Sequence, residues 1–149
     1  MKYLFVDFDG VLHPSPSKGE LFSQSKIFCD SLVNHKDNFL IVMSSSWRET
    51  YDYEDIIEAF EPTIRDRVVG VTPILENNLH PLGRYHEIIA YCEQNQILDS
   101  DWVAIDDMAH LFPKKCPNLI LTNPQTGITE KELQILENLL RKPKNQAKP

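Results

Sequence analysis

Two pairs of carboxylates, each directly after an apolar run, are the side chains of this sequence best suited to chemistry. Asp7 and Asp9 follow one run, and Asp106 and Asp107 follow another. In an extended segment, residues i and i+2 point to the same side, so Asp7 and Asp9 are expected to face one target. Carboxylates gathered in a small volume repel each other unless a cation lies among them, and ligand sets made only of oxygen suit Mg²⁺.

Each pair also has a simpler interpretation when it is taken alone. Asp-x-Asp followed by Gly10 is typical of a turn with solvated acids, and Asp106 with Asp107 is equally compatible with a helix cap. Together they are more informative, because each pair ends an apolar run of strand length. The sequence therefore predicts that the two pairs meet around a divalent cation.

A third apolar run ends in hydroxyl groups. Residues 39–43 are apolar without interruption, which predicts a strand covered on both faces, and Ser44, Ser45 and Ser46 follow. Open parallel sheets bind ligands beyond the carboxyl ends of their strands. Three strand ends thus bring polar groups to one predicted edge.

Short apolar runs alternate with segments of helical period along the chain. Strands are predicted at residues 2–6, 39–43, 68–71, 102–105 and 119–121, and helices at residues 21–34, 53–60, 85–92 and about 129–141. Thr129 and Glu132 form a predicted capping box at the start of the last helix. Parallel strands need long crossovers, so this order predicts a three-layer α/β fold: about five parallel strands with helices on both faces.

The composition is that of one soluble globular domain. With 149 residues, 42% hydrophobic and 25% charged, the chain can bury a core without disulfide bonds. We expect a domain over residues 1–141, a polar loop at 77–83 and a disordered tail at 142–149. The net charge of −7 argues against a non-specific nucleic-acid binder, although not against a site that takes one end of a strand.

The pattern of apolar and cysteine residues bears on the compartment. No run approaches the roughly 20 apolar residues of a membrane helix, and the apolar start reaches Asp7 too early for a signal peptide. Three cysteines without CxxC spacing disfavour a disulfide framework or a zinc site. We expect a cytoplasmic protein without a membrane partner.

In the order and spacing of its motifs, nearly the whole chain resembles the haloacid dehalogenase (HAD) superfamily of phosphohydrolases. The matching segments are residues 5–11 (FVDFDGV), 39–44 (FLIVMS), 81–88 (PLGRYHEI) and 102–107 (WVAIDD). Residues 45–48 (SSWR) and 122–129 (TNPQTGIT) also resemble a small capless group, the HAD domains of RNA-repair-associated (Swiss Army Knife) proteins.

The resemblance implies a role for each acid. Asp7 would be the nucleophile that becomes an aspartyl-phosphate, and Asp9 would be the general acid and then the general base. The Mg²⁺ ligands would be the Asp7 side chain, the Asp9 backbone carbonyl and Asp106, with help from Asp107. The implied reaction is Mg²⁺-dependent hydrolysis of a phosphomonoester.

The resemblance also implies phosphate-binding residues: Ser44 or Ser45, Gly10 and a basic side chain. Ser44 comes first after the apolar run, whereas counting back from Trp47 favours Ser45; we place Ser44 first.

For the basic position, Arg84 is the best match. Arg48, Lys114 and Lys115 compete with it, although the two lysines follow the fourth motif and so break the family order. A surface salt bridge is the alternative for Arg84.

Other side chains near these motifs have two interpretations each. His13 either contacts substrate or caps a turn, and His110 either lines the site or lies half-exposed on a helix. For Trp47, core packing is favoured over stacking on a base.

Substrate choice in the HAD superfamily depends on cap domains, and the stretches at residues 18–38 and 71–84 are too short for one. We expect an open site that takes a phosphorylated small molecule, or the phosphate end of a larger substrate such as a nucleic acid, but no long nucleic acid. The alternatives are a phosphotransferase and a catalytically silent metal- or phosphate-binding regulatory protein. A phosphoaspartate receiver domain is disfavoured, because its acceptor Asp lies at strand three, where this chain has Val71 and Thr72.

Overall fold

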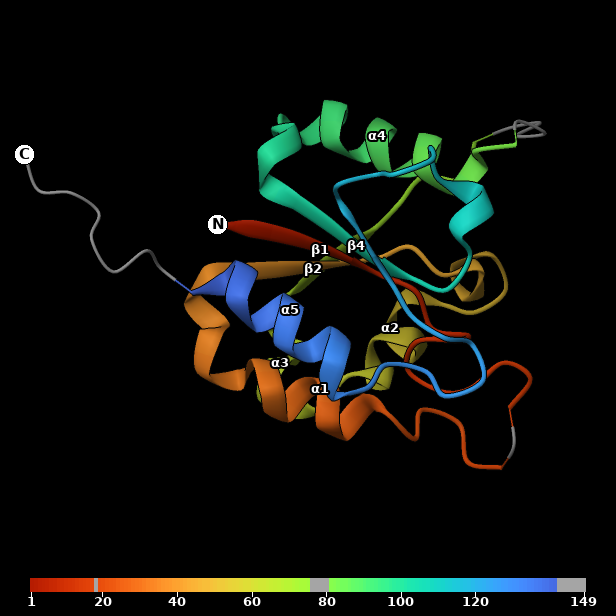
Figure 1. The fold of residues 1–149 in the computed structure, drawn as a ribbon, viewed down its shortest axis with the longest axis vertical. Coiled ribbons are helices and arrows are strands. Elements are labelled where there is room, and N and C mark those ends of the chain that lie inside the picture. Colours follow the sequence, from red (N-terminus) through yellow and green to blue (C-terminus); the bar gives the residue numbers. More distant parts are fainter. Residues whose placement is uncertain (18, 76–80, 142–149) are drawn as a thin grey trace, which may run out of the picture.

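The computed structural model describes residues 1–17, 19–75 and 81–141, and its centre is a five-stranded parallel sheet (Figure 1). The strands are β1 (Lys2–Val6), β2 (Phe39–Met43), β3 (Val68–Val71), β4 (Trp102–Asp106) and β5 (Leu119–Leu121). Their order across the sheet is β3-β2-β1-β4-β5, and every neighbouring pair is parallel. Because β1 is central and pairs with β2 and β4, the three polar strand ends are neighbours.

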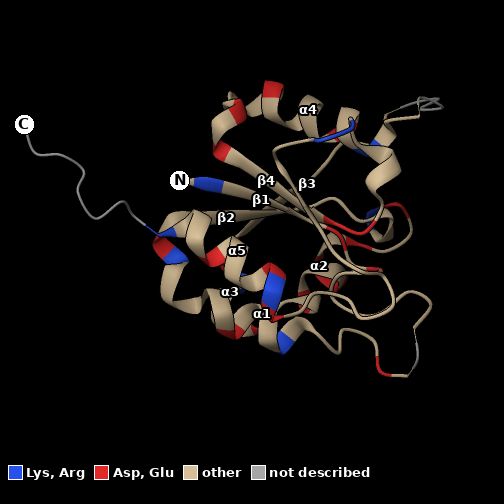
Figure 2. Cartoon of the chain, viewed as in Figure 1, with Lys and Arg blue, Asp and Glu red and all other residues tan. Residues whose placement is uncertain are grey.

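Helices cover both faces of the sheet, as the three-layer prediction requires. They are α1 (Ser25–Leu32), η1 (Val33–Asn38), η2 (Ser46–Glu49), α2 (Tyr53–Ile56), η3 (Ile57–Ala59), α3 (Pro62–Arg65), α4 (Gly83–Asn95), η4 (Asp99–Asp101), η5 (Ala109–Leu111) and α5 (Glu130–Leu140). In Figure 1, α4 lies on one side of the strands, and α1, α3 and α5 lie on the other. Acidic side chains occur on α1, α4 and α5, so both outer layers carry negative charge (Figure 2).

The core is divided by the sheet. Successive residues of β1 point to opposite faces, so Leu4 and Val6 belong to the cluster under α1 and α5, while Phe5 belongs to the cluster under α4. All three side chains are fully buried. The apolar runs therefore formed strands because both of their faces are covered.

Two predicted helices are wrong in extent. In residues 21–34 the helix begins only at Ser25, because Phe22 has a positive φ of 59°, outside the right-handed helical region. The Phe22 amide donates to the His13 ring, and the Gln24 amide donates to the Leu12 carbonyl. These tertiary hydrogen bonds hold the segment before Ser25 in its non-helical conformation.

In residues 53–60 the predicted helix is divided into the short helices α2 and η3. Ile56 and Phe60 are still buried. The apolar spacing therefore predicted correctly that these side chains are buried, although they do not lie on one continuous helix.

The last helix matches its prediction closely. α5 begins at Glu130, and the Glu132 side chain accepts the Thr129 amide at 2.8 Å, as the capping box requires. Among the described helices, none has the length and apolar character needed to cross a membrane. The predicted tail at 142–149 and part of the predicted loop at 77–83 lie outside the described residues.

A tight turn at Gly10 directs the chain away from the sheet after β1. Gly10 has a φ of +80°, its amide donates to the His13 carbonyl at 2.8 Å, and its carbonyl accepts from the Thr122 hydroxyl at 2.6 Å. A Cβ at this position would collide with the Asp107 carboxylate. The close approach of strand ends β1 and β4 therefore depends on a residue without a side chain.

Gly10→Ala is expected to lower the free energy of unfolding by about 3 kcal/mol, since it adds a collision with Asp107 to the cost of a left-handed backbone. The matched control is Gly19→Ala, where φ is +138° but a Cβ meets no atom within 4 Å. There we expect a loss of about 1 kcal/mol. Urea denaturation measures both values, and equal losses would contradict the close approach at Gly10.

Candidate active site

The two acid pairs meet at the ends of β1 and β4. Asp7, Asp106 and Asp107 each offer a carboxylate oxygen, and these oxygens lie within 4.8 Å of one another. Asp7 and Asp106 are buried, and Asp107 is partly exposed. Parallel pairing of β1 with β4 explains the meeting, because Val6 is in register with Ile105 and the acids follow directly.

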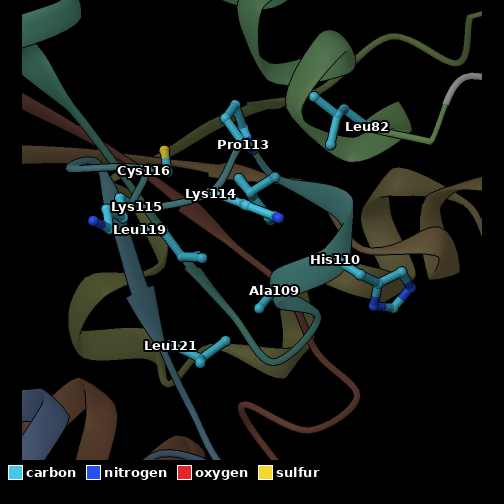
Figure 3. A pocket seen from close by; sticks show the side chains of 10 residues that line it. Leu82, Ala109, His110, Pro113, Lys114, Lys115, Cys116, Leu119 and Leu121 are labelled. Atoms are coloured by element: carbon cyan, nitrogen blue, oxygen red, sulfur yellow. The ribbon is translucent and has the colours of Figure 1, made fainter.

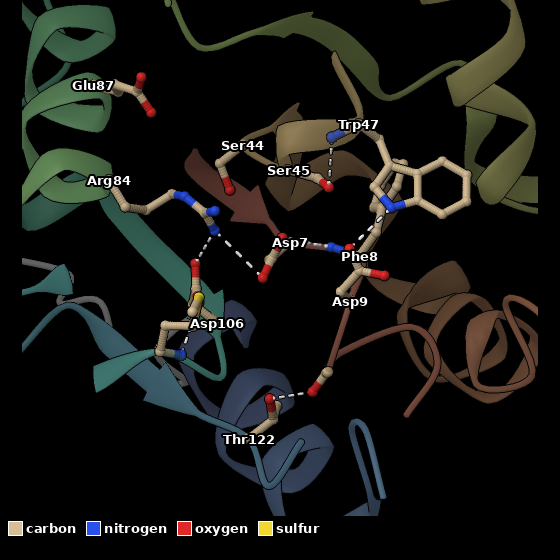
Figure 4. Close-up of polar contacts among 12 residues, drawn as sticks. Asp7, Phe8, Asp9, Ser44, Ser45, Trp47, Arg84, Glu87, Asp106 and Thr122 are labelled. Atoms are coloured by element: carbon tan, nitrogen blue, oxygen red, sulfur yellow. Dashed lines mark hydrogen bonds and ion pairs between the residues drawn. The ribbon is translucent and has the colours of Figure 1, made fainter. Parts of the chain in front are cut away.

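Arg84, in the first turn of α4, reaches into this cluster (Figure 4). Its Nη1 lies 2.6 Å from Asp106 Oδ2 and 3.3 Å from Asp7 Oδ2. The other oxygen of each acid accepts a backbone amide, from Phe8 to Asp7 Oδ1 and from Met108 to Asp106 Oδ1, both at 2.9 Å. Both carboxylates are thus fixed in orientation from two sides.

The acid cluster holds more negative than positive charge, with three carboxylates and one guanidinium. Burial, and then the charge of Asp106, raise the pKa of Asp7 well above its usual range, and Arg84 only partly offsets them. Burial and the Asp106 charge also raise the pKa of Asp107. Burial lowers the pKa of the Arg84 guanidinium, but the charges of Asp7 and Asp106 outweigh it, so the net direction is upward. The cluster therefore favours additional positive charge.

One atom in the cluster lacks a partner. Asp107 Oδ1 is buried and has no hydrogen-bond partner among the residues that the structure describes. Three carboxylates beside one guanidinium, with an unpaired buried oxygen, fit a hard divalent cation such as Mg²⁺.

Asp9 differs from the expectation that four carboxylates share one small volume. Its Oδ1 is hydrogen-bonded to His13 Nε2 at 2.7 Å, and its Oδ2 accepts from Trp47 Nε1 at 3.0 Å. The Asp9 carboxylate is not part of the three-acid cluster. It still lines the same pocket as Asp7 and Arg84, with its side chain 48% exposed.

The serines after β2 have different tasks. Ser45 Oγ accepts the Trp47 amide at 3.2 Å and so caps η2. Ser44 Oγ is buried without a hydrogen-bond partner in the described part of the chain, and it points toward the space between Arg84 and Asp7 (Figure 4). This geometry favours Ser44 over Ser45 as a ligand for an added phosphoryl oxygen.

The expected contact of Gly10 with phosphate stays a prediction, and the structure shows what Gly10 does within the fold. Its amide donates to the His13 carbonyl, so it is already satisfied within the turn. The structure supports a packing role for Gly10 against Asp107.

Of the basic residues that compete with Arg84, none lies in the acid cluster. Arg48 is 3% exposed, donates to the Thr72 and Pro73 carbonyls and pairs with Glu87 at 2.9 Å, so it ties the ends of β2 and β3 to α4.

Lys114 and Lys115 line a separate, largely apolar groove of about 830 Å³, together with His110 (Figure 3). His110 is exposed on η5, away from the acids.

The pocket over the acids is small. Its volume is about 250 Å³, and Ser15, Ser46 and Met108 complete a lining formed by Asp7, Asp9, Arg84 and Asp107. Pockets that enclose a whole drug-sized ligand measure roughly 300–1,000 Å³. This pocket is therefore smaller than such pockets, and its volume is enough for a group as small as a phosphoryl group.

Sequence reasoning misses the contacts that Asp9 makes. It leaves His13 open between substrate contact and turn cap, and it favours core packing for Trp47, whose ring does pack against the core. Their contact with Asp9 depends on two loops that meet in space, and no spacing in the sequence signals it.

Comparisons with known proteins bear on the identity of this site. Comparisons with curated proteins and with solved structures returned no match. Residues 3–133 match a family model described as the HAD domain in Swiss Army Knife RNA repair proteins. This match spans most of the chain and contains every residue of the acid cluster, and the capless three-layer fold agrees with it. The chain therefore belongs to this family of HAD domains.

Proposed function

We propose that this protein is a Mg²⁺-dependent phosphomonoester hydrolase that works through an aspartyl-phosphate at Asp7. The observation that carries the proposal is the surroundings of the Asp7 carboxylate. It lies at the central strand end, beside Arg84 and two further acids, with the unpartnered Ser44 hydroxyl directed toward the same space. A carboxylate cannot approach a phosphate dianion unless positive charge and donors accompany it.

In the first step, an Asp7 carboxylate oxygen attacks phosphorus and forms a P–O bond. The bond from phosphorus to the leaving oxygen breaks, and that oxygen takes a proton from the Asp9 carboxyl group. Arg84 and Ser44 donate hydrogen bonds to the phosphoryl oxygens and so stabilise the charge that moves onto them.

In the second step, the Asp9 carboxylate removes a proton from a water molecule whose oxygen attacks the same phosphorus. The bond from phosphorus to Asp7 breaks, which releases phosphate and restores both acids. Asp9 is suited to this exchange because its side chain is half exposed to solvent in the pocket shared with Asp7.

The metal would be held by the carboxylates of Asp7, Asp106 and Asp107 and by the Asp9 backbone carbonyl. When bound, Mg²⁺ neutralises negative charge on the transferring phosphoryl group. The unpaired Asp107 Oδ1 and the excess of carboxylates over guanidinium support this assignment.

For the substrate class, we propose the phosphate end of a nucleic acid. The description of the matching family model names RNA repair proteins. In addition, a pocket that is open to solvent, without a cap, suits a phosphate that protrudes from a larger molecule. The groove with the exposed Lys114 and Lys115 follows the acid pocket along the chain, since Met108 lines the pocket and Ala109 lines the groove. The acidic outer layers argue against contact with a long nucleic acid.

Asp7→Asn is expected to reduce Mg²⁺-dependent phosphate release from an aryl phosphate by about a thousandfold or more, because the amide cannot serve as the nucleophile. Asp30→Asn, which affects an exposed ion pair with Lys26, should leave the rate unchanged. Steady-state phosphate release measures both variants. Equal rates for Asp7→Asn and wild type would contradict the proposal. A wild-type protein without turnover would instead support the alternative of a catalytically silent regulatory protein.

Mg²⁺ should raise the Tm of the wild-type protein without substrate. At 100 times its Kd, a ligand adds about 2.7 kcal/mol of stability, which corresponds to about 5–10 °C at this chain length. The shift should shrink as pH falls through the raised pKa of Asp7, because a protonated carboxyl group is a poor ligand.

Asp106→Asn should lose this response to Mg²⁺, whereas Asp30→Asn should keep it. Thermal unfolding at several Mg²⁺ concentrations makes the comparison. An unchanged wild-type Tm at millimolar Mg²⁺, or the same shift in Asp106→Asn, would count against the assigned metal site.

The double variant Lys114→Gln, Lys115→Gln tests the substrate class. It should raise KM for a phosphate-ended oligonucleotide several-fold, because each lysine that contacts a backbone phosphate contributes to binding. KM for a small aryl phosphate should not change. Equal KM values for the oligonucleotide in both proteins would show that the groove does not take part in binding.

A further inference from the structure

The Asp9 carboxylate is held by two side chains from different loops. His13, in the loop after β1, contacts Oδ1 at 2.7 Å, and Trp47, in η2 after β2, donates to Oδ2 at 3.0 Å. Both partners use a ring N–H. Each oxygen of Asp9 therefore has its own donor, which fixes the plane of the carboxylate as well as its place.

The hydrogen bonds of His13 define which ring nitrogen carries the proton. The Phe22 backbone amide donates to Nδ1 at 3.1 Å, so Nδ1 acts as the acceptor. In a neutral imidazole the other nitrogen then carries hydrogen, and Nε2–H is the donor to Asp9. The side chain of His13 is 1% exposed, so water does not compete for either nitrogen.

Aromatic packing holds both donors in place. The His13 ring lies 5.0 Å from Phe22 and 5.9 Å from Trp47, centroid to centroid. Trp47 also contacts Phe22 at 5.2 Å and Phe8 at 5.9 Å. Rings packed in this way have little freedom to rotate, so the donors are in position before any substrate arrives.

We propose that His13 and Trp47 are positioning residues that aim the Asp9 carboxylate at the leaving oxygen and at the attacking water. They also keep the Asp9 carboxylate out of the cluster of Asp7, Asp106 and Asp107, although Asp7 is only two residues away in the sequence. The inference rests on the proposed hydrolase function. Each carboxylate oxygen has two lone pairs, so a hydrogen bond on each oxygen still leaves a place for the transferable proton.

The geometry predicts a difference between two substitutions of His13. The amide group of His13→Gln can reach the position of Nε2 and still donate to Asp9, whereas that of His13→Asn reaches only the position of Nδ1. Trp47→Phe keeps an aromatic ring in the packing and removes only the N–H donor.

His13→Asn is expected to lower kcat by about 10- to 100-fold, with KM for an alkyl phosphate within about twofold, because a misplaced catalytic group affects the transition state more than binding. His13→Gln should recover most of kcat, and Trp47→Phe should lower it in the same way as His13→Asn. Steady-state kinetics and thermal unfolding are measured on all three variants.

Two readouts separate positioning from a merely structural role. The loss in His13→Asn should be larger with an alkyl phosphate than with an aryl phosphate, because the poorer leaving group depends more on the proton from Asp9. With the aryl phosphate, phosphorylated Asp7 should accumulate in quenched samples, since water activation is then the slower step. A general loss of packing would lower both rates equally without accumulation.

The ring nitrogens of His13 provide a test that does not need turnover. Nitrogen-15 NMR of the wild type at neutral pH should show hydrogen on Nε2 and none on Nδ1. Hydrogen on Nδ1 would overturn the inference, as would equal losses on both substrates or no recovery in His13→Gln.

If Asp7→Asn abolishes hydrolysis while Trp47→Phe and a folded His13→Asn both match wild type, only the positioning inference fails. If the wild type does not hydrolyse any phosphomonoester, the proposed function fails and the positioning inference fails with it. If His13→Asn does not fold, the kcat of Trp47→Phe tests the positioning inference: a reduced kcat supports it, and a wild-type kcat overturns it.

Discussion

Mutual repulsion among buried carboxylates is the constraint on which the rest of this structure depends. Carboxylate oxygens of Asp7, Asp106 and Asp107 lie within 4.8 Å of one another, and in the described part of the chain Arg84 is the cation that pairs with Asp7 and Asp106. Such an arrangement is costly, because burial and like charge both raise the pKa of Asp7. The surrounding fold must therefore impose this arrangement, and a bound cation would relieve the repulsion.

The parallel sheet imposes the close approach of the carboxylates. Pairing of β1 with both β2 and β4 places three strand ends side by side, and helices seal both faces over side chains that alternate across the strands. Gly10 allows the closest approach, since any side chain there would collide with Asp107. Stability from the two cores thus offsets the unfavourable electrostatics at one edge, as functional sites commonly require.

The elements that could be predicted from the sequence share one physical reason, and the contacts that could not be predicted share another. The strands could be predicted because apolar runs buried on both faces leave a continuous signal, and the acid pairs could be joined because parallel strand ends share an edge. The sequence leaves Ser44 and Ser45 hard to tell apart, because only the fold shows that Ser45 Oγ accepts the Trp47 amide and caps η2. The helix predicted over residues 21–34 begins later, at Ser25, because Phe22 has a positive φ of 59° where its amide bonds to His13, nine residues away. Contacts between loops have no periodicity, so a single sequence does not reveal them.

Asp7 and Asp9 are two residues apart and identical in type, yet their surroundings differ in a way that suits different tasks. Asp7 is buried beside a guanidinium and other carboxylates, where its charge and orientation are set by the cluster. Asp9 is half exposed, and its contacts are ring nitrogens of His13 and Trp47. A nucleophile needs a fixed, dry position, whereas a group that gives and takes protons needs access to water and leaving group. The turn from Gly10 to His13 brings the His13 ring back to Asp9, so one short loop can provide both environments.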